Sequence, residues 1–318
     1  MNKNCLVIGA GMAGLTAART LQQNGWQTTV LDKGRGLGGR LATRRIEAGK
    51  ADHGAQYFTV RTPEFEKLVA TMQQVGVVKP WDLRTSQHPR FVGVEGMNAV
   101  AKFLANGLDV RTNERVVSIA QNDTDCTATT ETGNCFTASH VIITAPAPQV
   151  ISLLKDSGIA LPEQQINALQ SIVYAPCLAV MVVLNQPSQI PVPGSLKFDN
   201  GPVAWVADNQ QKGISPQLPT LTIHASPAFS RAHLESNLDQ TGAQLIEALR
   251  EWIPADTVVS YQVHRWRYSL AERTQPDPFL VAQTPFSLLI GGDGFGMGNV
   301  EGAFLSGWNM AQHLLQYP

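Results

Sequence analysis

Apolar and polar residues change their period several times along the chain, and the first change lies close to the N-terminus. Residues 5–9 form a continuous apolar run that is typical of a buried strand. Apolar residues then recur at helical spacing from Leu15 to Leu21, and Asn24 precedes a glycine that would end the helix. Residues 27–32 return to a strand-like pattern. The pattern therefore predicts a strand, a glycine turn, a helix and a second strand in succession.

The later part of the chain contains further strand-like segments. They cover residues 111–119, 141–144, 171–184, 203–207, 220–225, 258–266 and 288–293. Residues 230–253 read as one helical segment that ends at Pro254, and residues 300–307 open a final helix. The strand-like segments between residues 171 and 266 carry no nucleotide-binding signal, and they predict a mixed or antiparallel sheet.

Length and charge exclude several functional classes. At 318 residues the chain exceeds the usual domain size of about 100 to 200 residues, so two domains are expected. Lys and Arg number 24 against 25 Asp and Glu, and a net charge of -1 lacks the field that holds nucleic acid or an anionic membrane. The apolar run at residues 172–184 is shorter than the ~20 residues that span a bilayer.

The cysteines indicate a reducing compartment. Cys5, Cys126, Cys135 and Cys177 contain no CxxC pair and no cluster with histidine, so neither a metal site nor a disulfide framework is predicted. A cytoplasmic location is expected.

The glycines after the first strand have the spacing of a dinucleotide site. Gly9, Gly11 and Gly14 would allow a tight turn, a close approach to a pyrophosphate and close helix packing, respectively. The helix that begins at Met12 and Ala13 would direct its amides at the phosphates. Asp32 lies 18 positions after Gly14, which suits a carboxylate that binds ribose hydroxyls. The alternative is a glycine turn in a unit that binds no ligand.

The next segment, residues 33–45, distinguishes between dinucleotides. It begins with Lys33, contains five basic residues and no acid, and carries the Gly38-Gly39-Arg40 sequence. A solvated basic loop is one interpretation. The segment also resembles the flavoprotein superfamily of amine oxidases, in which a GGR sequence lies against the FAD pyrophosphate. The resemblance implies FAD as the dinucleotide, with Arg40 at its pyrophosphate, and leaves Arg44 and Arg45 either solvated or facing the substrate.

Three more stretches carry this resemblance. They are DHGAQYFT at residues 52–59, RTNERVVSI at 111–119, and LLIGGD at 288–293 followed by VEGAFLSG at 300–307. The resemblance places the first beside the flavin ring, Val116 at the adenine, Asp293 at the ribityl chain and the last helix at the flavin pyrimidine edge, where aligned amides would stabilise a reduced flavin. The cofactor residues implied here, besides those named above, are Ala55, Gln56, Tyr57, Phe58, Val300, Glu301 and Ala303.

Within the superfamily the chain is most similar to the renalase-like proteins. GMAGL, GGRLATRR, DHGAQYFTVR, GMNAVAKFLA, VIITAPAPQ, HRWRY and VEGAFLSG occur in the order of that family. The resemblance implies an FAD enzyme that takes a hydride from an isomer of a reduced nicotinamide dinucleotide onto flavin N5 and passes the electrons to oxygen, with release of hydrogen peroxide. A small-molecule substrate is therefore expected, and the oligomeric state is left open.

The resemblance also implies the fold. It predicts an α/β protein with an FAD-binding, Rossmann-like domain of the glutathione-reductase type and an inserted α+β substrate domain on a mixed or antiparallel sheet. Residues 1–62, 97–152 and 265–318 would form the FAD-binding domain. Residues 63–96 and 153–264 would form the substrate domain.

Hydride transfer requires no obligate catalytic base, so the candidates at the substrate are orienting residues. They are His53, Tyr57, Trp205, His224, Arg265, Trp266 and Tyr268. Alternation in residues 220–225 places His224 on the less apolar face of its strand, where a solvated histidine is the simpler interpretation. Trp205, Trp266 and Tyr268 are large aromatic residues and are expected in the core.

Two alternatives remain open from the residues. An amine oxidase or desaturase would use the same cofactor, but the tyrosine that such enzymes commonly place before the final helix is missing, because no tyrosine lies between Tyr268 and Tyr317. Covalent flavin attachment through a C-terminal cysteine is excluded because no cysteine follows Cys177. The second alternative is a flavin-binding protein without turnover.

Overall fold

The computed structural model describes residues 3–83, 88–122 and 125–317. The helices are α1 Met12–Gln23, α2 Pro63–Gln74, α3 Asn98–Ala105, α4 Ala147–Asp156, α5 Glu163–Gln170, α6 Pro227–His233, α7 Leu238–Glu247 and α8 Val300–Gln316, with a short 3-10 helix at Ala255–Thr257. Across these ranges, no helix combines the length and the apolar character needed to cross a membrane.

The strands group into a parallel sheet, an antiparallel sheet and smaller ribbons. In chain order they are β1 Asn4–Ile8, β2 Gln27–Asp32, β3 Thr43–Ile46, β4 Gly49–Asp52, β5 Phe58–Thr59, β6 Val78–Pro80, β7 Arg90–Gly93, β8 Asp109–Thr112, β9 Val116–Asn122, β10 Asp125–Thr130, β11 Cys135–Ala138, β12 His140–Ile143, β13 Val173–Leu184, β14 Ser195–Lys197, β15 Val203–Asp208, β16 Thr220–Ala225, β17 Val258–Arg273, β18 Leu280–Val281 and β19 Ser287–Ile290.

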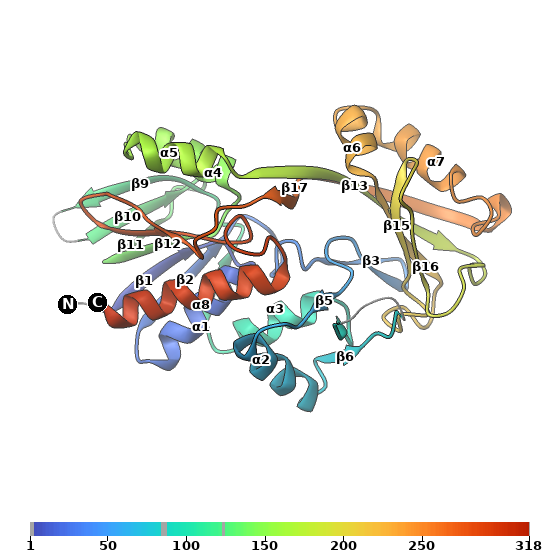
Figure 1. The fold of residues 1–318 in the computed structure, drawn as a ribbon, viewed down its shortest axis with the longest axis horizontal. Helices are drawn as coiled ribbons and strands as arrows, with labels where there is room; N and C mark the ends of the chain where they lie inside the picture. Colours follow the sequence, from blue (N-terminus) through green and yellow to red (C-terminus); the bar gives the residue numbers. More distant parts are fainter. Residues whose placement is uncertain (1–2, 84–87, 123–124, 318) are drawn as a thin grey trace.

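The parallel sheet has the order β18-β19-β12-β1-β2-β8, with β18 antiparallel at its edge. Alternate residues of β1 serve opposite faces, as the strand period requires. Cys5 and Val7 pack in the hydrophobic cluster of α1 and α8, whereas Leu6 and Ile8 pack with β9, β10 and α4. Both faces of the sheet are therefore covered, which is the layer arrangement of a Rossmann-like domain. Figure 1 shows α1 and α8 below this sheet and the β9–β11 ribbon with α4 and α5 above it.

Glycine allows α1 to lie unusually close to its neighbours. A Cβ added at Gly14 would lie 1.9 Å from the backbone oxygen of Gly9. A Cβ added at Gly307 of α8 would lie 2.1 Å from the backbone oxygen of Ala13. Both distances are far below van der Waals contact, so these two positions fix the packing of α1 against β1 and α8.

The antiparallel sheet has the order β14-β15-β16-β13-β17, and β13, which lies between β16 and β17, is buried along most of its length. Leu178, Val180 and Val182 face a hydrophobic cluster under α6 and α7. Met181 and Val183 point to the opposite face, where they pack on the β3–β4 hairpin. In Figure 1, β13 and β17 extend from the region of the parallel sheet to the second sheet, which carries α6 and α7 on its outer side.

Most of the elements expected from the sequence are confirmed, including both strands and the helix of the N-terminal unit. Two expectations are wrong. Residues 111–119 form two strands, because Asn113 has a φ of 59° and its amide binds the Gly34 oxygen, which turns the chain from β8 into β9. Residues 230–253 contain two helices, because Asn237 caps α7 by accepting a hydrogen bond from the Gln240 amide.

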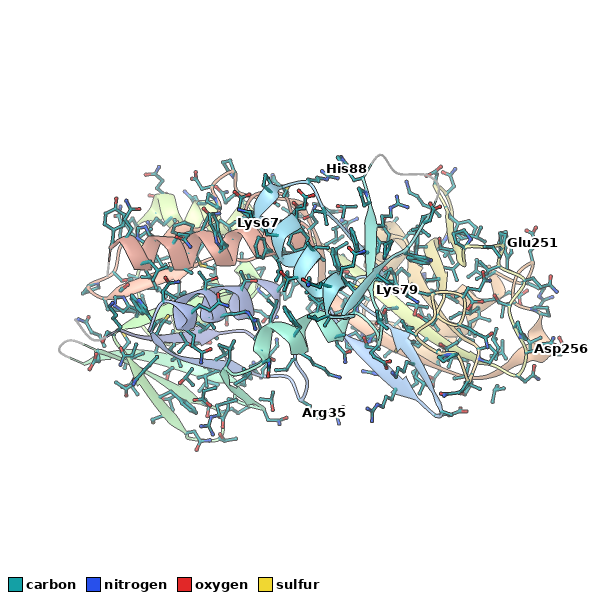
Figure 2. The ribbon with its side chains drawn as sticks, turned by 90° about the horizontal axis from the view of Figure 1, so that it is seen from below. Arg35, Lys67, Lys79, His88, Glu251 and Asp256 are labelled. Carbon is teal, nitrogen blue, oxygen red and sulfur yellow. The ribbon has the colours of Figure 1, made fainter. Side chains whose placement is uncertain are left out.

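The segment 63–96 connects the two sheets. Its residues Phe65, Val69 and Met72 on α2 belong to the same hydrophobic cluster as α1 and α8. Lys79 on β6 lies in the middle of the molecule in Figure 2. Its Nζ approaches Gly213 in the loop after β15, since a Cβ added to that glycine would lie only 2.5 Å from the Nζ. The segment therefore contacts both parts of the protein, and its assignment to the substrate domain stays a prediction.

We expect Gly307→Ala to lower the free energy of unfolding by about 1–3 kcal/mol, because the new methyl group forces α8 away from α1. Alanine in place of a helical glycine otherwise stabilises by about 1 kcal/mol, so a net loss identifies the close approach. Thermal unfolding measures the change. Gly36→Ala is the matched control, since a Cβ there meets no atom of the described residues within 4 Å. Equal melting temperatures for both variants would contradict the prediction.

Candidate functional site

The glycine turn lies at the carboxyl end of β1, between the neighbouring strands β2 and β12. This is the point of an open α/β sheet where ligands bind. Gly11 is the N-cap of α1 and no side chain caps the helix there. A Cβ added at Gly11 would meet no atom of the described residues within 4 Å. The helix therefore opens onto free space with unpaired amides, which suits a pyrophosphate.

Asp32 fixes this turn at the end of β2. Its Oδ2 accepts a hydrogen bond from the Ala10 amide at 2.7 Å, and its Oδ1 accepts one from the Gly34 amide at 2.7 Å. The carboxylate keeps further lone pairs for a ribose hydroxyl. This placement agrees with the role that the sequence predicts for it.

The Gly38-Gly39-Arg40 segment folds back over the glycine turn. The Gly38 amide donates to the Ala10 oxygen at 2.8 Å, and the Ala55 amide donates to the Arg40 oxygen at 2.8 Å. A Cβ at Gly54 would lie 2.0 Å from that Arg40 oxygen. Two segments that the sequence analysis assigned to the cofactor, residues 38–40 and 54–55, are thus hydrogen-bonded to each other beside the turn.

Arg40 and Asp293 form a bidentate ion pair, with Nη2 and Oδ1 at 2.6 Å. Burial of the guanidinium opposes its charge, but the Asp293 carboxylate outweighs this and raises the pKa of Arg40 above its usual range. The sequence assigned Arg40 to the pyrophosphate and Asp293 to the ribityl chain. The pair brings together two side chains that the sequence assigned to one FAD molecule, and their contacts with FAD stay a prediction.

The N-terminus of α8 follows Asp293 in the chain. Asn299 caps it by accepting a hydrogen bond from the Gly302 amide at 2.8 Å. Glu301 is fully buried, and its Oε1 accepts hydrogen bonds from the Arg61 and Thr62 amides at 3.0 and 2.7 Å. Its side chain therefore holds the segment that leads into α2, a role that the sequence did not indicate.

The remaining predicted cofactor residues are distributed around these two helix ends. Met12 and Ala13 form the first turn of α1, and Val300 and Ala303 the first turn of α8. Lys33 Nζ donates to Gln149 Oε1 at 3.0 Å, and Val116 begins β9.

Two residues of the 52–59 stretch use their side chains within the protein. Gln56 Nε2 donates to the backbone oxygens of Asp52 and Gly54 at 2.6 and 3.1 Å. The ring of Phe58 packs in the core against Phe65 and Phe91. For Phe58, therefore, the backbone is the part left to face a cofactor.

Two of the predicted substrate residues, Trp205 and His224, lie side by side on the inner face of the antiparallel sheet. Trp205 pairs with His224, His224 with Ala179, and Ala179 with His264, so these residues form one row across β15, β16, β13 and β17. Directly opposite residues of neighbouring strands point to the same side of a sheet. We call these four residues, Trp205, His224, Ala179 and His264, the sheet row.

The turn after β4 lies against the sheet row. The His53 ring is 4.9 Å from the His264 ring and 5.4 Å from the Trp266 ring, between centroids. Trp266 Nε1 donates to the His53 oxygen at 2.7 Å. At the other end of the row, the Tyr57 ring lies 5.7 Å from that of Trp205. His53, Tyr57, Trp205 and His224 are thus brought together.

Several buried polar atoms in this region have no hydrogen-bond partner in the described part of the chain. They are His53 Nδ1, Gln56 Oε1, Trp205 Nε1, Asn209 Oδ1 and His224 Nε2. Arg265 does not belong to this group, because it pairs with Leu178 on the opposite face of the sheet, where its Nη2 donates to the Ser236 oxygen. Buried polar atoms are paired in the great majority of proteins, so a cluster of unpaired ones indicates a bound molecule.

The histidines at this site are neutral at physiological pH. Burial, together with the neighbouring His264, Arg44 and His224, lowers the pKa of His53 to about 3. Burial lowers the pKa of His224 and of His264 to about 4. Each ring therefore offers one donor and one acceptor instead of a positive charge.

A fully buried ion pair supports the turn after β4. Lys212 Nζ lies 2.7 Å from Asp52 Oδ2, and neither side chain is exposed. Asp52 Oδ1 also accepts hydrogen bonds from Thr43 Oγ1 and the Met97 amide. Burial lowers the pKa of Lys212, and the Asp52 carboxylate opposes this shift. Lys212 further lies 5.3 Å from the centre of the Trp81 ring.

Sequence reasoning missed several residues of this region. His264 could have been found, because alternation from residue 258 puts it on the same face as Trp266. Lys212 and Trp81 lie in loops without periodicity and gave no signal. Trp205, Trp266 and Tyr268, which were expected in the core, are half-buried, and Trp205 packs against the hydrophobic cluster of α1 and α8. Among the described residues, no group of His, Cys, Asp and Glu side chains is arranged to hold a metal.

Comparison with known proteins assigns the family. Residues 74–315 match the model of the flavin containing amine oxidoreductases, and residues 7–74 match that of an NAD(P)-binding Rossmann-like domain. The chain belongs to the flavin containing amine oxidoreductase family. This flavin oxidoreductase is 27% identical to renalase of Mus musculus over 98% of each chain. It is 36% identical to an L-amino acid oxidase of Bothrops pictus over 27% of this chain and 16% of that protein.

Solved structures share the fold of this flavin oxidoreductase. A protein assigned as a protoporphyrinogen oxidase from Exiguobacterium sp. 255-15 has a TM-score of 0.78 at 13% identity, with all of each chain covered. A putrescine oxidase bound to putrescine has a TM-score of 0.73 at 15% identity, with 98% of this chain and 99% of that chain covered.

These findings confirm the α/β fold, the renalase-like resemblance and an FAD-dependent oxidoreductase. FAD is the cofactor, and the residues present fit it. The space beside Gly11, the uncapped start of α1 and the free lone pairs of Asp32 match a nucleotide and its pyrophosphate. When bound, FAD supplies the electron-accepting chemistry. The contact of each individual residue with FAD stays a prediction.

We expect Gly11→Val to abolish FAD binding while leaving the fold intact. The space next to Gly11 is free of described atoms, so the valine fits the protein itself but fills the predicted pyrophosphate position. Flavin absorbance per protein and circular dichroism measure the two effects. Full FAD occupancy in the variant would show that the pyrophosphate lies elsewhere.

We expect Lys212→Met to lower the free energy of unfolding by about 3–5 kcal/mol, because it leaves the Asp52 carboxylate buried and unpaired. The double variant Lys212→Met/Asp52→Asn removes that charge and should recover part of the loss. Urea unfolding measures both. Lys197→Met is the control, since the Lys197–Asp199 pair is largely exposed and should change stability by less than about 1 kcal/mol. A loss no greater than that of the control would contradict the prediction.

Proposed function

We propose that this flavin oxidoreductase takes a hydride from an isomer of a reduced nicotinamide dinucleotide onto flavin N5 and transfers the electrons to oxygen, which is released as hydrogen peroxide. The hydride supplies two electrons and one proton, and one further proton from solvent completes the reduction of one oxygen molecule to one hydrogen peroxide. The observation that carries this proposal is the chemistry of the sheet row. Trp205 Nε1 and His224 Nε2 of this row are uncharged, have no hydrogen-bond partner among the described residues and lie on one face of the sheet.

An uncharged, planar substrate group suits these atoms. Trp205 Nε1 can only donate a hydrogen bond, whereas the neutral imidazoles of His53 and His224 can each donate and accept. A carboxamide offers an acceptor oxygen beside donor hydrogens, and so it complements such a set. The rings of Tyr57 and Trp205, 5.7 Å apart, supply flat surfaces for the ring that carries it.

The same region is poorly suited to a protonated amine. The nearest buried carboxylate, Asp52, already binds Lys212, Thr43 and the Met97 amide, so its charge is compensated. A cation would have to leave water without an opposing charge, which is costly. This argues against the amine oxidase reading, although the family and the putrescine oxidase fold are compatible with it.

The protein side chains act here by position. His53, His224 and Trp205 orient the donor carbon, and the hairpin β3–β4 with the sheet excludes water from the reacting atoms. Proton abstraction by a side chain is not required when the bond breaks as a hydride. The first turn of α8 stabilises negative charge near its amides.

Anaerobic rapid mixing of the FAD-loaded protein with candidate substrates tests which molecule donates the hydride. We expect a 2- or 6-dihydronicotinamide dinucleotide to bleach the flavin absorbance rapidly, and putrescine or an L-amino acid to leave it unchanged. Admission of air should then restore the absorbance and produce one peroxide per flavin. Bleaching by amines alone would establish the amine oxidase alternative, and resistance to every donor would indicate a flavin protein without turnover.

Trp205→Phe tests the sheet row in the same experiment. It keeps an aromatic ring but removes Nε1, and loss of one hydrogen bond of about 0.5–1.5 kcal/mol should raise the apparent donor dissociation constant by about two- to tenfold. Trp252→Phe is the matched control, because Trp252 packs on Phe198 beneath the opposite face of the sheet. Equal effects of the two variants would remove Trp205 from the substrate site.

A further inference from the structure

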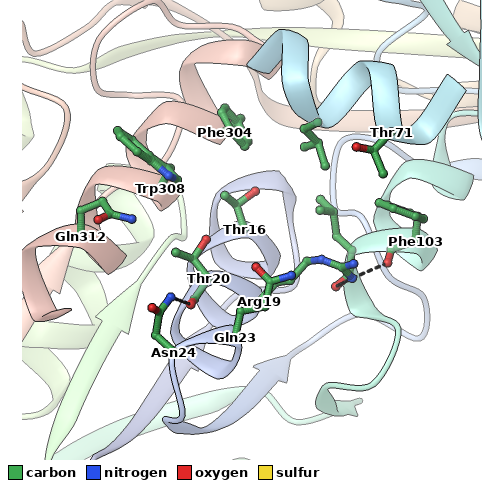
Figure 3. A pocket seen from close by; sticks show the side chains of 12 residues that line it. Thr16, Arg19, Thr20, Gln23, Asn24, Thr71, Phe103, Phe304, Trp308 and Gln312 are labelled. Atoms are coloured by element: carbon green, nitrogen blue, oxygen red, sulfur yellow. Dashed lines mark hydrogen bonds between the residues drawn. The ribbon is translucent and has the colours of Figure 1, made fainter. Parts of the chain in front are cut away.

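A groove of about 410 Å³ opens on the outer side of the FAD-binding domain, between α1, α2, α3 and α8. Figure 3 shows it from close by, with α1 as its floor. Its lining shares no residue with the predicted cofactor or substrate sites. The volume lies within the range of about 300–1,000 Å³ that is usual for small-molecule sites.

Aromatic rings form the walls of the groove. Phe304 on α8 is buried, whereas Trp308 one turn later and Phe103 on α3 are half-buried and so keep part of their surface open. Leu68 on α2 and Leu104 on α3 add aliphatic surface. Such walls favour a flat ring, which gains contact area and stacking at little entropic cost.

Thr16 on the floor of the groove carries an unpaired hydroxyl. The residue is only 3% exposed, and its Oγ1 has no hydrogen-bond partner among the described residues. Figure 3 shows its side chain pointing from α1 toward the groove. Threonine in a helix populates two χ1 rotamers, so one rotation exchanges its hydroxyl and methyl positions. A ligand acceptor at this point would satisfy a polar group that otherwise stays unpaired.

Arg19 supplies the charge of the groove. Its Nη1 donates to the backbone oxygens of Phe103 and Leu104 at 3.0 and 3.3 Å, and its guanidinium lies 4.9 Å from the centre of the Phe103 ring. Over the part of the chain that the structure describes, the lining contains no Asp, Glu or Lys. Arg19 and Thr16 are three residues apart on α1 and so lie on the same face of the helix.

We propose that this groove is a second ligand site, separate from the predicted FAD site, which binds a planar aromatic carboxylate. The carboxylate accepts hydrogen bonds from Thr16 Oγ1 and from the free edge of the Arg19 guanidinium, and the ring lies against Phe304 and Trp308. The assignment depends on the groove alone and not on the donor proposed above.

The test uses 2-naphthoate as the probe and isothermal titration calorimetry of the FAD-loaded protein. We expect saturable binding with one site, and binding at least tenfold weaker for the neutral analogue 2-naphthamide. Thr16→Val should weaken 2-naphthoate about tenfold, because a hydrogen bond to a charged group contributes about 1.5–3 kcal/mol and 1.4 kcal/mol is a factor of ten.

Thr28→Val is the matched control. Thr28 is another buried threonine whose Oγ1 has no partner within the described ranges, but it lies on β2 and does not line the groove. Unchanged binding in this variant and weakened binding in Thr16→Val would support the proposal. Absence of binding, equal effects of the two variants, or release of FAD by 2-naphthoate would overturn it. Melting temperatures of both variants confirm that each is folded.

Discussion

The buried Asp52 carboxylate joins the two halves of this protein. It accepts hydrogen bonds from Lys212 in the loop after β15, from Thr43 on β3 and from the amide before α3. A carboxylate with no exposure cannot remain charged without such partners, so the turn after β4, the antiparallel sheet and α3 must keep one relative position. His53 and Tyr57 follow Asp52 within five residues, and their places against the sheet row depend on this arrangement.

The packing around the cofactor site depends on a different constraint, namely glycine residues at the points where backbones approach each other most closely. At Gly14 and Gly307 the backbones of β1, α1 and α8 approach so closely that no Cβ fits. This brings the N-termini of α1 and α8 to the same edge of the parallel sheet. At Gly11, by contrast, the free volume lies outside the protein and is available to a ligand. One residue type therefore serves protein packing at two positions and ligand binding at a third.

Much of the fold and of the cofactor site could be predicted, because the signals are local. The apolar run, the glycine spacing and Asp32 all lie within residues 5–32 and act through backbone geometry. The ordered family motifs then identified FAD and the renalase-like resemblance. The interruption between β8 and β9 at Asn113 could not be predicted, because the left-handed backbone of this residue is accompanied by a hydrogen bond from its amide to the distant Gly34 oxygen. The hydrogen bonds of Glu301 to the Arg61 and Thr62 amides before α2 likewise join residues about 240 positions apart.

The sequence by itself determined the family, the cofactor and the residue types available to the substrate. Only the tertiary structure decided which of those residues meet. The sheet row exists because the registers of β15, β16, β13 and β17 align Trp205, His224 and His264, and register is a property of paired strands and not of any one strand. The neutrality of its histidines and the pairing of Lys212 with Asp52 follow from burial, which depends on what packs above each residue after folding.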